Sequence, residues 1–238
     1  MANTACCLVV GAGPGLGRAV AARFAEAGLH AVVSSRDEAR CGAVADAVRR
    51  SGGESTAVPC DAADPAAVES LFQRVERDLG IPEAVVYNAG TFQPGRVTDI
   101  EPEAFERCWR VGCFGGYLVG RRAAQGMLGT GHGTIIFTGA TASLRGGAGF
   151  ANLAVGKFGL RALAQSMARE LGPQNIHVAH SIIDGQILSE RHADLASERP
   201  EDALLVPEAI ADQYLALHRQ HRSAWTHELD FRPWVERW

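Results

Sequence analysis

Residues 10–17 read VGAGPGLG, and this glycine-rich stretch decides which fold the sequence encodes. An apolar run at residues 5–10 leads into it, and an amphipathic segment rich in alanine follows at residues 15–27. The order of strand, glycine turn and helix suits the pyrophosphate of a dinucleotide, because the first N–H groups of a helix are unpaired and glycines let the backbone approach a ligand. The residues expected to bind it are Gly11, Gly13, Gly15, Leu16 and Gly17.

The rest of the chain alternates between short β-branched runs and longer amphipathic stretches, which is typical of βαβ units around a parallel sheet. The predicted strands cover residues 5–10, 30–34, 55–59, 84–87, 134–138, 176–183 and 223–229. The predicted helices cover residues 15–27, 37–50, 64–79, 102–128, 151–171 and 207–220, with a polar loop at 188–205. We therefore predict a single α/β domain over residues 1–238, a three-layer Rossmann fold with helices on both faces of a doubly wound parallel sheet of about seven strands.

Composition and charge exclude several classes of protein. The net charge is −4 with acids and bases interspersed, so the chain lacks the concentrated basic surface that nucleic acid binding requires. The apolar run at residues 5–10 is too short for a signal peptide or a membrane span, and we expect a cytoplasmic protein with no membrane partner. The six cysteines have no zinc-ligand spacing, which predicts free thiols and no metal site.

Several motifs occur in the order found in the short-chain dehydrogenase/reductase family, which the sequence resembles over nearly its whole length. The spacing of Gly11, Gly15 and Gly17 is similar to the family's glycine motif, with Val10 where the family usually has threonine. The resemblance implies that residues after other strands also hold the cofactor. These are Asp61 and Ala62 at the adenine, Asn88, Ala89 and Gly90 along the cofactor, Lys157 at the ribose, and Gly185, Ile187 and Ser189 beside the nicotinamide.

The end of the second predicted strand indicates which dinucleotide is bound. NAD sites usually have an acid there for the ribose 2′-hydroxyl, whereas this chain has Ser35 followed by Arg36. A guanidinium can bind a 2′-phosphate through two hydrogen bonds, so NADP is the predicted cofactor and NAD the alternative. Two other interpretations stay open: Arg36 could stack on the adenine of either cofactor, and Asp37 could be the acid, although it comes one or two positions late.

Other residues occupy the positions where the family has its acid and base. In the family, a tyrosine four residues before the lysine transfers the proton, a serine after the fifth strand polarises the substrate oxygen, and an asparagine completes a water relay. These positions correspond to Leu153, Ala140 and Gly112, so that Lys157 alone is retained. A carbonyl can be reduced only if the developing alkoxide is protonated or stabilised, and the sequence therefore predicts an atypical active site.

Five polar residues near these positions are candidates to replace the missing groups: Thr138, Thr141, Ser143, Asn152 and Asp184. Each also has a structural interpretation, since threonines at a strand end can bond the backbone and Asn152 can cap a helix. Asp184 stands where the family has a proline before the glycine of its nicotinamide segment. Its carboxylate could act as a base if its pKa were raised, or it could be a solvated loop residue.

Three functions are compatible with these residues. The first is an oxidoreductase that acts on a small-molecule carbonyl or alcohol with a non-standard proton donor, such as a water held by Lys157. The second is a non-redox enzyme, because some natural-product relatives in the family have lost the tyrosine and use the pocket for cyclisation or cycloaddition. The third is a catalytically silent NADP-binding subunit, and the fold alone does not separate the three. The helical regions at 102–128 and 151–171 match those through which family members pair, so we expect a homodimer or homotetramer.

Overall fold

A parallel sheet of seven strands forms the centre of the described part of the chain, in the order β3-β2-β1-β4-β5-β6-β7. The structure is a computed structural model that describes residues 4–189 and 192–236. The strands are β1 (Cys6–Val10), β2 (His30–Ser34), β3 (Ser55–Ala57), β4 (Ala84–Tyr87), β5 (Gly133–Thr138), β6 (Ile176–Ile183) and β7 (Glu228–Phe231). All six neighbouring pairs are parallel, which confirms the predicted Rossmann-type α/β fold.

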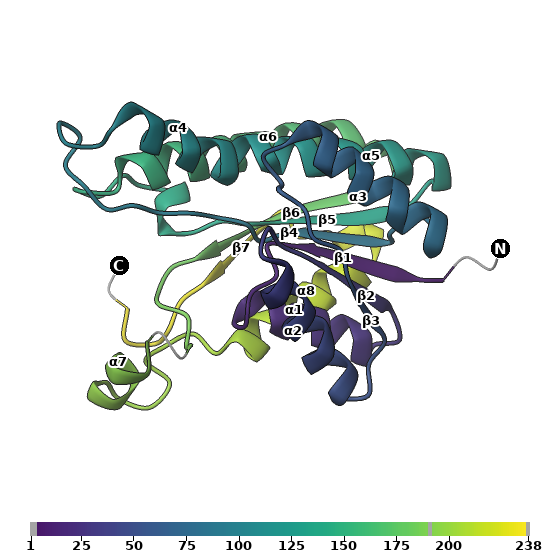
Figure 1. Ribbon diagram of the computed structural model, residues 1–238, viewed down its shortest axis with the longest axis horizontal. Coiled ribbons are helices and arrows are strands. Elements are labelled where there is room, and N and C mark those ends of the chain that lie inside the picture. Colours follow the sequence, from purple (N-terminus) through teal and green to yellow (C-terminus); the bar gives the residue numbers. More distant parts are fainter. Residues whose placement is uncertain (1–3, 190–191, 237–238) are drawn as a thin grey trace.

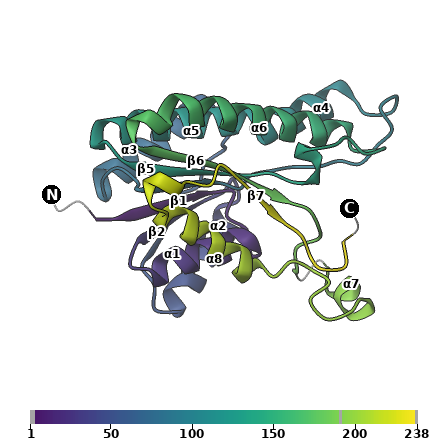
Figure 2. The same ribbon diagram turned by 180° about the vertical axis from the view of Figure 1, so that it is seen from behind.

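Helices cover both faces of this sheet, so the molecule has three layers (Figures 1 and 2). One layer contains α1 (Leu16–Glu26), α2 (Glu38–Arg50) and α8 (Pro207–Arg219). The other contains α3 (Pro65–Asp78), α4 (Pro102–Trp109), α5 (Gly115–Thr130) and α6 (Ala151–Leu171). A short helix, α7 (Ala193–Glu198), lies apart from both layers near the C-terminal end of the chain.

Burial on both faces explains the composition of the strands. All residues of β1 and β6 are buried, because a parallel sheet between two helical layers has no face in contact with water.

The helix that follows β3 begins as predicted: Asp64 accepts a 2.9 Å hydrogen bond from the Ala66 N–H, and Pro65 occupies the first turn. The six cysteines are free thiols, and five of them are buried. No helix in the described ranges is long and apolar enough to cross a membrane.

Four predicted elements differ from the observed ones. The helical region predicted at 102–128 is divided by a π-helical turn, η1 (Arg110–Phe114), between α4 and α5. The seventh strand is not at 223–229 but at β7, because that segment is the one that pairs with the end of β6, while the residues before it form a 3₁₀ turn. β3 ends two residues earlier than predicted, and the predicted polar loop contains α7.

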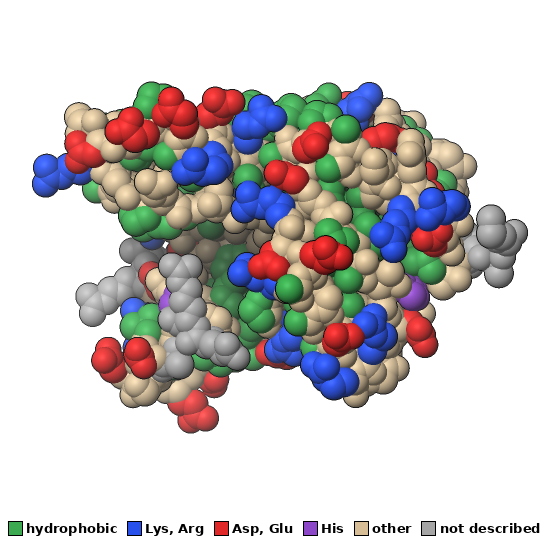
Figure 3. All heavy atoms as spheres, viewed as in Figure 1, with side chains coloured by type: hydrophobic (Ala, Val, Ile, Leu, Met, Phe, Trp, Pro, Cys, Tyr) green, Lys and Arg blue, Asp and Glu red, His purple; other side chains and the backbone are tan. Residues whose placement is uncertain are grey.

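The topology places the candidate residues at one edge of the sheet. The order of the strands reverses between the neighbouring strands β1 and β4, and in such sheets ligands bind in the crevice outside the carboxyl ends of the strands at this point. Gly11 follows β1, Asn88 follows β4, Thr138 ends β5 and Asp184 follows β6, so segments distant in sequence converge there. Figure 3 shows the surface hollowed between the layer that contains α4 and the region of α7, with hydrophobic atoms inside.

Candidate dinucleotide and substrate site

The glycine turn combines close packing with open space. Gly11 has a φ of +89°, and a Cβ atom there would lie 2.3 Å from the main-chain nitrogen of Ala89, so only glycine fits between β1 and the segment after β4. A Cβ atom on Gly17 would lie 2.7 Å from Cα of Ala12. At Gly13 and Gly15, in contrast, a Cβ atom would meet nothing within 4 Å. Gly11 and Gly17 therefore serve packing, whereas Gly13 and Gly15 leave the backbone free in front of the N-terminus of α1.

A cavity of about 530 Å³ lies beside this turn. Nine of the predicted cofactor residues line it: Gly11, Gly13, Ser35, Arg36, Asp61, Ala62, Asn88, Ala89 and Gly90. Val10, Ala12, Asp37, Arg40, Cys60 and Val111 also line it. The structure thus brings together residues that follow β1, β2, β3 and β4, as the Rossmann fold requires for the adenosine end of a dinucleotide. Gly15 and Ser189 line a second cavity, of about 850 Å³, which shares Arg40 with the first.

Two charged residues at the far end of the cavity interact with each other. Asp37 caps α2 by accepting a 3.0 Å hydrogen bond from the Arg40 N–H, and its other carboxylate oxygen lies 3.7 Å from Nη2 of Arg40. Ser35 Oγ donates to the main-chain carbonyl of Asp37. Arg36 lines the same cavity. Arg40 was not predicted from the sequence; it lies in the first turn of α2, whose N-cap, Asp37, directly follows Arg36.

Two polar side chains hold the segments that follow β3 and β4. Asn88 Nδ2 donates a 3.0 Å hydrogen bond to the carbonyl of Gly11, which ties the two strand ends together. Asp61 Oδ1 accepts a 3.0 Å hydrogen bond from the Ala63 N–H, and its carboxylate remains at the wall of the cavity. Both residues therefore shape the predicted cofactor site and also contribute to its rigidity.

Lys157 extends from α6 toward the carboxyl ends of β4 and β5. Its Nζ donates a 2.6 Å hydrogen bond to the main-chain carbonyl of Thr138 and would lie 3.8 Å from a Cβ atom placed on Gly90. The side chain is buried, and this burial lowers the pKa of Lys157 to about 8. It is the only lysine in the sequence; all other residues with a permanently basic side chain are arginines.

The segment after β6 is held by the chain's C-terminal region. Gly185 packs so closely against Pro233 that a Cβ atom would lie 2.7 Å from the proline Cδ. Ile187 forms a β-bridge with Leu205, and Ser189 Oγ contacts His192 Nδ1 at 3.1 Å. Neither Gly185 nor Ile187 lines the first cavity, so their predicted contact with the nicotinamide remains an expectation.

The three residues predicted to stand at the family's acid and base positions belong to segments at this edge. Leu153 is on α6, one turn before Lys157, and Ala140 follows β5. Gly112 lies in the π-helical turn, where a Cβ atom would be 3.5 Å from Cα of Gly156 on α6. Gly112 and Gly156 therefore allow a close approach of two helices, a packing reason for glycine that the sequence pattern did not reveal.

The three tyrosines of the chain lie elsewhere. Tyr87 is buried in β4 and donates to the carbonyl of Val111, and Tyr117 is exposed on α5. Tyr214 belongs to α8, on the opposite face of the sheet from α6, and is fully buried. Its hydroxyl bonds Thr138 Oγ1 at 2.9 Å and also Ser181 Oγ, and burial raises its pKa to about 12. Tyr214 is thus part of the packing between β5, β6 and α8.

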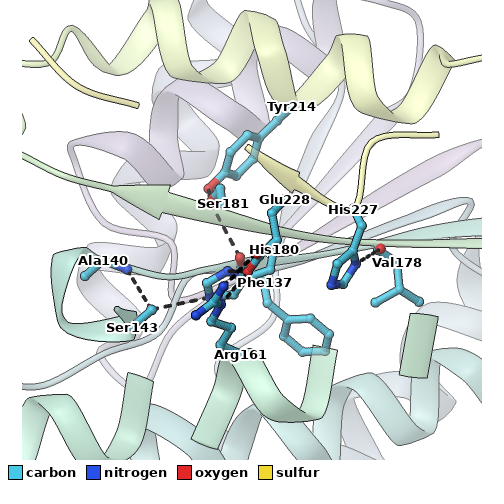
Figure 4. A network of polar contacts seen from close by, with 10 residues as sticks. All are labelled: Phe137, Ala140, Ser143, Arg161, Val178, His180, Ser181, Tyr214, His227 and Glu228. Atoms are coloured by element: carbon cyan, nitrogen blue, oxygen red, sulfur yellow. Dashed lines mark hydrogen bonds and ion pairs between the residues drawn. The ribbon is translucent and has the colours of Figure 1, made fainter. Parts of the chain in front are cut away.

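A buried polar network lies below Ala140 (Figure 4). Ser143 Oγ accepts a 3.1 Å hydrogen bond from the Ala140 N–H and lies 3.4 Å from His180 Nε2. On its other side, His180 Nδ1 is 3.4 Å from Glu228, which forms a two-bond ion pair with Arg161. Burial lowers the pKa of His180 to about 4, so the imidazole is neutral near neutral pH. Ser143 and His180 are fully buried, so neither side chain is open to solvent, whereas Arg161 and Glu228 are partly exposed.

The other candidate replacements are also bonded to the protein. Thr138 contacts Tyr214, and Asn152 does not cap α6 but donates a 2.7 Å hydrogen bond to the carbonyl of Gln93. Asp184 is not a solvated loop residue: it is buried, accepts a hydrogen bond from Thr141 and pairs with Arg232 at 2.8 Å.

Comparison with known proteins identifies the family. Residues 5–199 match the family described as short chain dehydrogenase. The chain belongs to this family. Versicolorin reductase 1 of Aspergillus parasiticus is 31% identical over 195 residues, which cover 80% of this chain and 72% of that protein. The protein named "Probable oxidoreductase EphD" of Mycobacterium tuberculosis is 40% identical over 115 residues, but these cover 48% of this chain and only 19% of EphD. The chain therefore matches about a fifth of the length of that relative.

Solved structures of family members have the same fold. A short-chain dehydrogenase from Rhodopseudomonas palustris is 36% identical and superposes with a TM-score of 0.84, with 97% of this chain and 99% of that chain covered. A metagenomic short-chain oxidoreductase in complex with NADP is 25% identical, also with a TM-score of 0.84, and the match covers 98% and 99% of the two chains. The family relationship thus agrees with the seven-stranded parallel sheet observed here.

Proposed function

We propose that this protein binds NADP(H) at the glycine turn and acts as an atypical oxidoreductase on a small-molecule carbonyl or alcohol, with Lys157 at the centre of its proton transfer. The observation that carries the proposal is the position of Lys157 at the carboxyl edge of the sheet, where its Nζ bonds the carbonyl of Thr138 and lies close to Gly90 at the wall of the first cavity. The nicotinamide, when bound, would supply or accept the hydride.

The cavity suits a dinucleotide on structural grounds. Gly13 and Gly15 leave open space in front of α1, where N–H groups can bind pyrophosphate. Arg36 and Arg40 at its adenosine end supply positive charge for a 2′-phosphate, which favours NADP over NAD. Asp37 lies 3.7 Å from Arg40 and offsets its charge, so the positive charge left for the phosphate is that of Arg36. A related chain in the family was solved in complex with NADP.

Lys157 supports the choice of proton donor. Arginine keeps its proton at any pH that proteins experience, whereas a buried lysine can release one near neutral pH. A chain that uses arginine at every other basic position and lysine at this one is suited to proton exchange here. The donor is then the Lys157 ammonium or a water that it holds, with Leu153, Ala140 and Gly112 providing an apolar surrounding.

A second function is favoured by the same three residues. If no proton transfer takes place, the pocket could serve a non-redox cyclisation or a silent NADP-binding subunit. An assay of NADPH oxidation with a panel of carbonyls separates these functions, because only the oxidoreductase consumes NADPH. NADPH oxidation that requires Lys157 supports the proposal. NADPH binding without oxidation in the presence of any carbonyl compound favours the alternatives.

We also propose a homodimer or homotetramer formed through α4, α5 and α6. Aromatic rings are exposed on this layer: Trp109 and Tyr117 both stack on Phe114, with ring centroids 5.8 and 6.2 Å away. Exposed apolar groups of this kind commonly mark an interface. Light scattering should give a mass of at least twice 25.3 kDa, and a monomer at micromolar concentration would contradict the proposal.

A further inference from the structure

An ion pair that is largely removed from water joins the end of β6 to the residue after β7. Nη2 of Arg232 lies 2.8 Å from a carboxylate oxygen of Asp184, and the two side chains are only 14% and 6% exposed. The main-chain N–H of Asp184 donates a 2.8 Å hydrogen bond to the carbonyl of Phe231, so backbone and side chain fix the same residue. Removing one partner of such a pair leaves the other charge buried, so a change at Arg232 would be felt at Asp184.

The next residue of the C-terminal region packs on the chain where it leaves the sheet. Pro233 is buried, and a Cβ atom on Gly185 would lie 2.7 Å from the proline Cδ and 3.3 Å from Cδ1 of Leu205. The N–H of Leu205 donates a 2.9 Å hydrogen bond to the carbonyl of Gln186, and its carbonyl accepts a 2.8 Å hydrogen bond from the N–H of Leu188. Gly185 therefore lies between the C-terminal region and the backbone bonds that join the segment after β6 to Leu205.

Trp234 contacts the excursion that follows β6 near its other end. Its Nε1 donates a 3.1 Å hydrogen bond to the carbonyl of Glu201. In both ribbon views the last part of the chain runs beside the excursion that contains α7 (Figures 1 and 2). Three consecutive residues, 232–234, thus hold the excursion at its start and close to its return.

The part of the excursion that these contacts hold extends to the glycine turn. Ser189 lines the second cavity together with Pro14 and Gly15, at the N-terminus of α1. A dinucleotide in a Rossmann fold places its pyrophosphate at this helix end and lies along the carboxyl ends of the strands. The first cavity, at the ends of β1 to β4, suits its adenosine half. Residues 185–189 therefore border the other half of the site, on the far side of the glycine turn.

We infer that Arg232 is a positioning residue for the nicotinamide half of the cofactor, because through Asp184 and Gly185 it holds residues 185–189 toward the glycine turn. This inference rests on the proposed function, since it concerns the same dinucleotide site. Among the described residues that line the first cavity, none belongs to residues 232–234. The two halves of the cofactor should therefore depend differently on Arg232.

Two ligands that share the adenosine half test this difference on the full chain by calorimetry. NADP⁺ carries both halves, whereas adenosine 2′,5′-bisphosphate lacks the nicotinamide half. Arg232→Gln should weaken NADP⁺ binding by about 3- to 10-fold, the equivalent of one hydrogen bond, and leave the affinity for the bisphosphate unchanged. A mere loss of positive charge would weaken both anions, because both carry the same 2′-phosphate and further negative charge.

Two further variants show which contact of Arg232 matters. Arg232 also lies 3.1 Å from Asp230, and Asp230→Asn removes only that ion pair, so this variant should bind both ligands like wild type. Arg232→Lys keeps a cation opposite Asp184 and should keep most of the NADP⁺ affinity. Circular dichroism shows that each variant retains the fold.

Amide hydrogen exchange, followed by nuclear magnetic resonance, gives a second measurement that needs no ligand. The N–H groups of Leu188 and Leu205 should exchange faster in Arg232→Gln than in wild type, whereas those of β1 should not change. Unchanged exchange at Leu188 and Leu205, an unchanged NADP⁺ affinity, or equal losses for the two ligands would each overturn the inference. If the wild-type protein binds neither ligand, the proposed function fails, and hydrogen exchange still tests whether Arg232 holds this segment.

Discussion

Lys157 Nζ donates a 2.6 Å hydrogen bond to the main-chain carbonyl of Thr138, and no carboxylate neutralises it within the described ion pairs. Burial among neutral groups disfavours the charged form, and this is the cause of its lowered pKa. The chain therefore carries, at the edge where a nicotinamide would bind, an amine that can exchange its proton near neutral pH.

The titration of Lys157 can be measured directly, because it is the only lysine in the sequence. Protein labelled with ¹³C- and ¹⁵N-lysine should give a single side-chain signal in the nuclear magnetic resonance spectrum. Without cofactor, that signal should titrate with a pKa of about 8. Titration near the ordinary value of about 10.4 would show that the ammonium is solvated and would remove the basis for proton exchange.

Stability should follow the same titration. The unfolded chain binds the Lys157 proton up to about pH 10.4, whereas the folded chain releases it near pH 8, so the free energy of unfolding should rise with pH between these values. Lys157→Met does not titrate at this position, so the free energy of unfolding of the variant minus that of wild type should fall by about 2–3 kcal/mol over this pH range. Urea unfolding should show this difference shrinking from pH 8 to pH 10, and a constant difference would contradict the assignment.

The glycine turn provides a matched pair of variants. Gly17→Ala places a Cβ atom 2.7 Å from the backbone of Ala12 and should lower the free energy of unfolding by about 1–3 kcal/mol. Gly13→Ala meets nothing within 4 Å and should unfold like wild type, yet it should weaken NADPH binding because its methyl group takes up space in front of the turn. If Gly13→Ala binds NADPH as tightly as wild type, the pyrophosphate does not lie there.

Arg36 tests the choice of cofactor. Arg36→Ala should weaken NADPH binding by about 1.5–3 kcal/mol, the range for a hydrogen bond to a charged group, and leave NADH binding nearly unchanged. Calorimetric titrations of both cofactors measure this, with Arg110→Ala as a control on an arginine that bonds the Ala63 carbonyl and does not line the cavity. Equal losses for NADPH and NADH would mean that Arg36 stacks on the adenine.

Restoring the family's acid should restore carbonyl reduction. Leu153→Tyr together with Ala140→Ser should raise the rate with simple ketones, since general acid–base catalysis typically contributes about 10²- to 10⁴-fold. Leu153→Phe with Ala140→Ser is the matched control, because it adds the ring without the hydroxyl. A similar gain in the control would attribute the effect to pocket shape and not to proton transfer.

The sequence predicts the elements that depend on local patterns. The glycine turn, the alternation of strands and helices and the cap at Asp64 all follow from residues close together in the chain. β7 was placed too early because an edge strand's register depends on its partner, here His180 to Ile183, which a local pattern does not contain. The ion pair between Asp184 and Arg232 was missed for the same reason, since it joins residues far apart in the sequence.

In the candidate site, too, the residues that local sequence patterns indicate were predicted, whereas contacts between distant segments were not. The cavity contains the residues that the motifs indicate at the ends of β1 to β4, because each follows a recognisable strand. Arg40 could have been found from its place in the first turn of the helix that directly follows Arg36. The packing of Gly112 against Gly156 could not have been predicted, because nothing in either local segment indicates that the two helices touch.

The central claim is that the protein binds a dinucleotide but lacks the ordinary proton donor of its family, with Lys157 in its place. The most direct test is NADPH oxidation with a panel of simple aldehydes and ketones, at NADPH concentrations where fluorescence shows the site to be saturated. We predict saturable NADPH binding, with reduction about 10²- to 10⁴-fold slower than in relatives that have the tyrosine, and complete loss of that residual rate in Lys157→Met. Ordinary family rates in the wild-type protein, or a residual rate that survives in Lys157→Met, would contradict the account.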